Sequence, residues 1–258
     1  MQALPLTNAE ALTWSGVPAG GLQTLSGTSI RPWRLPLADL DLFTPTRGSF
    51  HHSSTSNSIL TQAANASGVR IVLCSDTDRI RMVVQPRFVY SPTDFDLVID
   101  NKLIDTRSFP PEKAPAPPPA GVAGSGSDGG AFKAWMQQME ALADERAAPL
   151  TVEFNGIAAC MGGEAGRRQN LEIWLPHRAT VTIVSLEVSA TASIASQLKD
   201  VRPRWITHGS SITHCAEAHS PSRTWPATAA RMANLNLFSL GFGGQVCEVD
   251  PVHSQLQL

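Results

Sequence analysis

Apolar and polar side chains alternate with a period of two through the middle of the chain. The alternation is clearest at residues 69–73, 80–84 and 95–99, where apolar positions interleave largely with Arg and Asp. Short turn-forming runs at residues 76–78 and 100–102 separate these segments. Such alternation is typical of half-buried antiparallel strands, with one face on a core and the other in water.

Further runs at residues 150–154, 171–175 and 180–188 predict three more strands. Residues 1–65 scatter Leu, Ile and Trp among Gly, Ser, Thr and Pro, which favours short strands and turns over helices. We therefore predict a mainly β N-terminal sandwich over residues 1–200, of a jelly-roll or carbohydrate-binding-like kind.

A segment of biased composition interrupts this pattern at about residues 110–130. Its first half is rich in Pro and its second half in Gly and Ser. The first half is expected to be stiff and extended, and the second flexible. Because β patterning resumes beyond it, we predict a disordered surface insertion rather than a domain linker. An amphipathic helix is predicted next, from about Phe132 to Arg146.

The pattern changes after residue 200. Residues 204–208 form a short strand that runs into the turn Gly209-Ser210-Ser211. A helix is predicted to open between Ser222 and Pro226, and a second apolar run follows at residues 235–240. Strand, helix and strand together predict the beginning of a parallel α/β sheet, whose carboxyl-terminal turns are where ligands bind.

Ser211 is a candidate nucleophile because of its place in the first of these turns. A strand-to-helix turn lifts the hydroxyl out of the sheet, and the following helix directs N–H groups and partial positive charge toward it. The glycine-rich turn after residue 240 is a candidate source of oxyanion donors. The motif departs from the G-x-S-x-G elbow, since Thr213 stands in place of the last glycine.

Taken together, the two turns resemble the first two sequence blocks of the SGNH/GDSL superfamily of esterases and acyltransferases. The run Gly-Ser-Ser-Ile-Thr at residues 209–213 is similar to Gly-Asp-Ser-x-Thr, with Ser211 at the nucleophile position and Ser210 in place of the aspartate. Residues 240–245 are similar to the second block, which implies that Gly244 donates its N–H to the oxyanion; Ser239 stands where that block often has Asn. Residues 217–231 strengthen the match to a subgroup with an N-terminal β-sandwich.

This resemblance covers residues 203–251 and implies that residues 201–258 are the N-terminal fragment of an SGNH hydrolase domain, the first βαβ part of a flavodoxin-like fold. The family's third block, with an oxyanion-hole Asn, and its late Asp-x-x-His are not found before Leu258. We therefore expect a serine ester hydrolase that is inactive or impaired as given and needs no cofactor. An acyltransferase relative, and a non-catalytic carbohydrate- or ligand-binding sandwich with a vestigial hydrolase stub, remain open alternatives.

None of the other histidines is a strong candidate for the missing base. His208 is expected to point into or across the sheet, and His214 and His219 to be packing or turn residues. His177 is expected on the surface or in a linker, and the pair at residues 51–52 in a solvated loop.

Composition limits the classes of partner that this chain is expected to bind. A formal net charge of −2 and a pI near 6.4 argue against nucleic acid and anionic membranes. The superfamily resemblance implies a small acyl-ester or glycosylated substrate. Residues 1–20 show no basic and apolar leader, which predicts a cytoplasmic protein.

Four widely spaced cysteines predict free thiols rather than a zinc site or a disulfide framework. They are Cys74, Cys160, Cys215 and Cys247. Three tryptophans are candidates for sugar stacking, although core packing is the favoured role for each. They are Trp14, Trp33 and Trp174.

Overall fold

Most of the regular structure is β-strand, as the alternating pattern predicts. The computed structural model describes residues 1–25, 27–39, 59–87, 93–110, 148–160, 166–195 and 200–243. The predicted insertion beyond Pro110, the predicted helix ending near Arg146 and the histidine pair at residues 51–52 lie outside the described residues.

The first sheet is antiparallel and contains six strands in the described part of the chain. Its order is β3-β4-β11-β6-β9, and β1 pairs with β11. The strands are β1 (Gln2–Ala3), β3 (Leu22–Thr24), β4 (Ile30–Pro32), β6 (Arg79–Arg87), β9 (Leu150–Asn155) and β11 (Thr180–Val188). The register between β11 and β6 shifts between Ile183 and Ser185.

The second sheet is also antiparallel, in the order β12-β5-β10-β7-β8, and β2 pairs with β5. Its strands are β2 (Thr13–Ser15), β5 (Arg70–Ser75), β7 (Thr93–Ile99), β8 (Lys102–Phe109), β10 (Gln169–Trp174) and β12 (Ile194–Ala195). Asp100 and Asn101 both have positive φ and form the tight β7–β8 hairpin turn. Sequence reasoning found this turn but missed β8, because that strand is largely polar and half-exposed.

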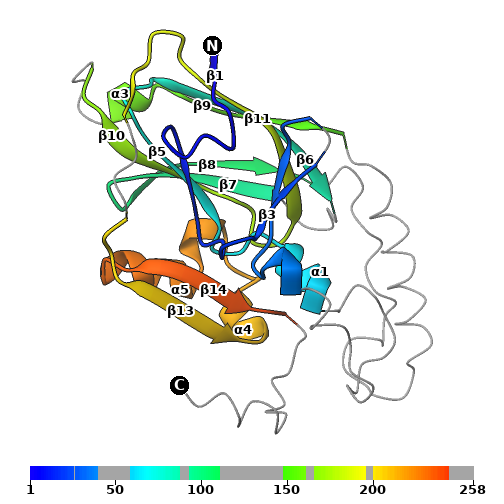
Figure 1. The fold of residues 1–258 in the computed structure, drawn as a ribbon. Helices are drawn as coiled ribbons and strands as arrows, with labels where there is room; N and C mark the ends of the chain where they lie inside the picture. The colour runs from blue at the N-terminus through cyan, green and yellow to red at the C-terminus, as the bar shows by residue number, and fades with distance from the viewer. Residues whose placement is uncertain are drawn as a thin grey trace, which may run out of the picture.

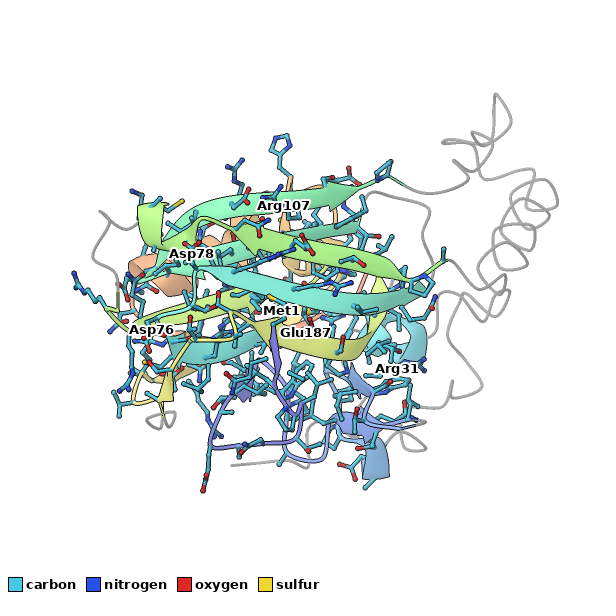
Figure 2. The ribbon with its side chains drawn as sticks, turned by 90° about the horizontal axis from the view of Figure 1, so that it is seen from above. Met1, Arg31, Asp76, Asp78, Arg107 and Glu187 are labelled. Carbon is cyan, nitrogen blue, oxygen red and sulfur yellow. The ribbon has the colours of Figure 1, made fainter. Side chains whose placement is uncertain are left out.

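The two sheets enclose one hydrophobic core. Ile71 and Phe95 from the second sheet pack in the same buried cluster as Ile80 and Ile183 from the first. The alternate residues of β6 point outward, where Arg81 pairs with Glu153 at 3.5 Å and with Glu187 at 3.7 Å. Figure 2 shows this charged outer face from above, with Glu187 and Arg31 among its side chains.

A third, parallel unit lies beside the two sheets (Figure 1). Its two strands are β13 (Arg204–Gly209) and β14 (Asn236–Gly241), paired in parallel so that Gly209 lies opposite Gly241. The connection contains α4 (Ser211–His214), η3 (Pro221–Arg223) and α5 (Trp225–Met232). The predicted strand, helix and strand are thus present, and α4 is an additional turn of helix. The other α-helices in the described ranges are α1 (Ile59–Ala64) and α3 (Ile157–Cys160).

The parallel unit covers the outer face of the second sheet. Val98 of β7 and Trp174 of β10 form a second buried cluster with Ala227 and Ala230 of α5 and Leu237 of β14. Every residue of β7 is consequently buried. The prediction of half-buried strands was wrong for β7, because its outward positions face protein rather than water.

Candidate active site

Ser211 is exposed at the carboxyl end of β13, where it is the first residue of α4. The carbonyl of Ser210 accepts a hydrogen bond from the His214 N–H at 2.9 Å, and the carbonyl of Ser211 accepts one from the Cys215 N–H at 2.9 Å. Cys215 then adopts a left-handed conformation and ends the turn. The strand-to-helix turn is present as predicted. It leads into a four-residue helix, so its peptide dipoles contribute less at Ser211 than those of a long helix.

Two glycines seat α4 on the ends of the strands. A Cβ on Gly209 would lie 2.3 Å from Oγ1 of Thr213, and one on Gly241 would lie 2.4 Å from the backbone nitrogen of His214. Real Cβ atoms do not approach other atoms so closely, and at Gly241 the obstacle is backbone. Glycine at these two paired positions therefore allows the helix carrying Ser211 to lie directly over both strand ends.

The beginning of the second glycine turn is attached to the first turn. The Phe242 N–H donates to the carbonyl of Gly209 at 2.8 Å, and the Gly243 N–H donates to Nδ1 of His214 at 3.2 Å. Gly244 itself lies outside the described residues, so its role as an oxyanion donor stays a prediction.

The His214 side chain points into the protein and is buried. Its Nε2 lies 2.6 Å from the carbonyl oxygen of His177. A carbonyl can only accept, so Nε2 carries the proton, and Nδ1 is left as the acceptor for the Gly243 N–H. Burial, assisted by the positive charge of Arg34, lowers the pKa of His214 to about 4. Both ring nitrogens are occupied within the protein, so His214 does not serve as the base for Ser211.

His177 is buried, and the prediction of a surface or linker position was wrong. Neither ring nitrogen of His177 has a hydrogen-bond partner among the described residues. Burial, and then the nearby charge of Arg178, lower the pKa of His177 to about 4. Its neighbour Arg178 donates to the carbonyl of Ala218 at 3.0 Å. The loop after α4 thus covers the segment around His177. No local sequence pattern predicts this contact.

His208 and His219 are both exposed. The expectation that His208 points into or across the sheet was wrong, because its side of β13 is open to solvent and also carries the exposed Ile206. Among the described residues, no group of three His, Cys, Asp or Glu side chains is placed to hold a metal ion.

The described cysteines have free thiols, as predicted; Cys247 lies outside the described residues. No helix within the described ranges has the length and apolar character needed to cross a membrane.

Arg34 is the residue of this region that sequence reasoning missed. It is 1% exposed and donates to the carbonyl oxygens of Ser239 at 3.1 Å and Gly241 at 2.5 Å. It also donates to the carbonyls of Gln62 and Asn65, and its guanidinium lies 4.6 Å from the centre of the Phe242 ring. Burial lowers its pKa to about 9. A single arginine so far from the second turn in sequence gives no local signal of this role.

Asp96 of β7 anchors the connection between α4 and α5. Its carboxylate accepts hydrogen bonds from the Ser220 hydroxyl at 2.7 Å, the Ser222 N–H at 2.8 Å and the Thr106 hydroxyl at 2.6 Å. Elsewhere in the same interface, Arg70 donates to Oδ1 of Asn236 at 2.8 Å. The antiparallel sheets thus help to hold the parallel unit in place through buried polar contacts.

Solved structures that share this fold include an acyltransferase, a GDSL-like lipase and a carbohydrate esterase. The salicylyl-acyltransferase SsfX3 from a tetracycline biosynthetic pathway is 25% identical with a TM-score of 0.69, and the match covers 99% of this chain and 59% of that one. A putative GDSL-like lipase from Bacteroides ovatus is 15% identical with a TM-score of 0.52, covering 91% and 57%. A family two carbohydrate esterase from Cellvibrio japonicus is 11% identical with a TM-score of 0.51, covering 95% and 53%.

The chain therefore spans less than two thirds of the length of each of these structures. No family model matches the sequence, and no curated protein matches it. The similarities support the superfamily resemblance seen in the two sequence blocks. The described residues have a mainly β fold that is shared with an acyltransferase, a GDSL-like lipase and a carbohydrate esterase.

Proposed function

We propose that this chain carries the nucleophile of an SGNH-type acyl-transferring enzyme, and that Ser211 is that nucleophile. The observation that carries the proposal is the exposed Ser211 at the end of β13, in a helix seated directly on the paired Gly209 and Gly241. The fold shared with an acyltransferase and with ester-cleaving enzymes supports it. Within this proposal, residues 1–200 are an accessory β-sandwich, and residues 201–258 begin a flavodoxin-like catalytic domain.

The chemistry follows from the nucleophile. Oγ of Ser211 attacks the carbonyl carbon of an acyl ester, its proton passes to a base, and the alkoxide leaves as an alcohol when it is protonated. The N–H groups of Ser211 and Gly244 would stabilise the tetrahedral oxyanion, each donor lowering the activation free energy by about 3 to 4 kcal/mol. Water or a bound hydroxyl then takes the acyl group from the serine. No metal or organic cofactor enters this scheme.

Among the described histidines, His214 does not provide the base, because both of its ring nitrogens are engaged inside the protein. His208 and His219 are exposed. With no base assigned to Ser211, we propose that the chain as given turns over slowly. A residual acceleration of about a thousandfold to ten-thousandfold over water is expected from binding and oxyanion donors alone.

Ester hydrolysis and acyl transfer to a hydroxyl both fit this scheme. The likeness to a salicylyl-acyltransferase, at 25% identity over 99% of this chain, favours acyl transfer as a second candidate. An aryl ester incubated with and without a short alcohol separates the two. Formation of the new ester at the expense of the free acid indicates transfer, and free acid alone indicates hydrolysis.

A sugar-binding role for the sandwich has less support. Trp174 is 2% exposed, and its ring lies under Arg70 at 4.8 Å. Trp14 and Trp33 donate their indole N–H groups to the Leu6 carbonyl and to Gln23, both at 3.0 Å. These contacts favour packing roles for the three tryptophans.

Labelling with a serine-reactive fluorophosphonate tests the proposal directly. Peptide mapping is expected to find the adduct on Ser211 in the wild-type chain and in Ser210→Ala, and not in Ser211→Ala. Ser210 is the matched control because it is the adjacent serine and its side chain makes no capping hydrogen bond. Phosphonylation of Ser211 no faster than that of Ser210 would remove the nucleophile assignment.

A further inference from the structure

We infer that His214 is a positioning residue that holds the second glycine turn against the helix carrying Ser211. The catalytic meaning of this inference rests on the function proposed above, whereas the contact itself stands on the geometry. His214 lies three positions after Ser211 in the same turn of helix. The candidate nucleophile is exposed, whereas the imidazole is buried.

The imidazole makes two hydrogen bonds of opposite sense. Nε2–H donates to the carbonyl of His177 at 2.6 Å, and Nδ1 accepts from the N–H of Gly243 at 3.2 Å. The first bond fixes the tautomer that the second one requires, because the ring must keep a lone pair on Nδ1. His177 therefore orients His214, and His214 orients the backbone at Gly243.

Gly243 allows this close approach. A Cβ at this position would lie 3.1 Å from Nδ1 of His214, tighter than an ordinary contact. The N–H of Gly243 lies in a partly buried setting. A partly buried donor left without an acceptor destabilises the backbone conformation that holds it, so the turn is expected to shift when this bond is lost.

The consequence concerns the oxyanion donors. Gly243 directly precedes Gly244, the donor that the sequence predicts. Phe242 is already tied to Gly209, and Arg34 holds the carbonyl of Gly241. The hydrogen bond from the Gly243 N–H to His214 is the last described contact of this kind. The start of the second turn is therefore held in a fixed position relative to the helix of Ser211. Preorganised donors must hold their positions to within about 0.5 Å to be effective.

Two isosteric substitutions separate the two hydrogen bonds. In His214→Asn the amide oxygen can replace Nδ1 as the acceptor for Gly243, and the bond to His177 is lost. In His214→Gln the amide N–H can replace Nε2 as the donor to His177, and the acceptor for Gly243 is lost. Each variant removes one buried hydrogen bond, so thermal unfolding is expected to show similar destabilisation of both.

Fluorophosphonate labelling of Ser211 in the full chain is the functional measurement. His214→Gln is expected to lower the labelling rate at least about tenfold, because the start of the second turn is released. His214→Asn is expected to restore most of that loss. Equal rates for two equally folded variants would overturn the inference, since a purely structural histidine would not distinguish them.

A spectroscopic measurement keeps the inference independent of the proposed function. In ¹⁵N-labelled wild-type protein at pH 7, Nε2 of His214 should be protonated and Nδ1 should not. The Gly243 amide should be protected from exchange in the wild type and in His214→Asn, and unprotected in His214→Gln. A protonated Nδ1, or equal protection in both variants, overturns the positioning role. Absence of labelling in the wild type with the protection pattern intact contradicts the proposed function alone.

Discussion

The guanidinium of Arg34 donates a hydrogen bond to the carbonyl of Gly241, a residue 207 positions further along the chain, at 2.5 Å. This contact joins the N-terminal segment to the carboxyl end of β14, next to the helix that carries Ser211. The geometry around the candidate nucleophile is therefore partly set by a residue near the beginning of the chain.

Replacing Arg34 by Met is expected to lower the free energy of unfolding by about 3 to 5 kcal/mol, because four buried carbonyls lose their donor. Urea unfolding followed by circular dichroism measures this change. Arg34→Lys keeps the charge but not the planar fork of donors, and should recover only part of the loss. Wild-type stability in Arg34→Met would contradict the role assigned to this side chain.

Gly241→Ala is expected to displace α4, since the added Cβ meets backbone atoms of Thr213 and His214. Labelling of Ser211 by a fluorophosphonate should fall at least about tenfold, as expected when a reacting group is misplaced by about 1 Å. Gly20→Ala is the control, because Gly20 has a φ of 74° and an added methyl group there would meet no atom within 4 Å. It should cost about 1 kcal/mol of stability and leave labelling unchanged. Equal labelling in both variants would refute the steric argument.

Acidification is expected to destabilise the protein between pH 6.5 and about 4. Burial lowers the pKa of both His177 and His214 to about 4, so the unfolded chain binds protons in this range while the folded chain does not. The positive charge of Arg178 further lowers the pKa of both histidines, and that of Arg34 further lowers the pKa of His214. The negative charge of Asp96 acts in the opposite direction and raises the pKa of His177. The drop from 6.5 to about 4 corresponds to at most roughly 3 kcal/mol for each histidine.

Urea unfolding measured at intervals from pH 4 to pH 8 tests this pH dependence. His177→Asn should flatten the slope, whereas replacement of the exposed His219 by Asn should leave it unchanged. Stability that stays constant or rises as the pH falls from 6.5 to 4.5 would show that these two histidines are not buried as neutral groups.

Asp96→Asn is expected to destabilise the protein by about 2 kcal/mol or more, because an amide offers one acceptor and two donors where three donors converge on a carboxylate. Asp94→Asn is the matched control on the same strand. Burial raises the pKa of Asp94, so its charge contributes less to folding, and its replacement should cost less than about 1 kcal/mol. Thermal unfolding at pH 7 compares the two variants. A smaller loss for Asp96→Asn than for Asp94→Asn would contradict the anchoring role.

The amino-acid sequence by itself determined most of the longer strands, although not β8. The alternation at residues 80–84 and the apolar runs at residues 180–188 and 204–208 correspond closely to β6, β11 and β13, because a strand records its two faces in neighbouring positions. The turn that contains Ser211 was likewise predicted, because glycine and serine between two apolar runs favour a turn. Gly244 lies outside the described residues and stays a prediction.

The tertiary structure decided how those segments meet. The outward face of β7 is buried because α5 and β14 pack on it, and this turns Asp96 from an expected surface residue into an anchor for the loop before α5. Arg34 and His177 acquire their roles from partners far away in the sequence. A local pattern reports only whether a position prefers water or a core. Which buried donor meets which buried carbonyl depends on long-range packing, and packing is settled only when the whole chain has folded.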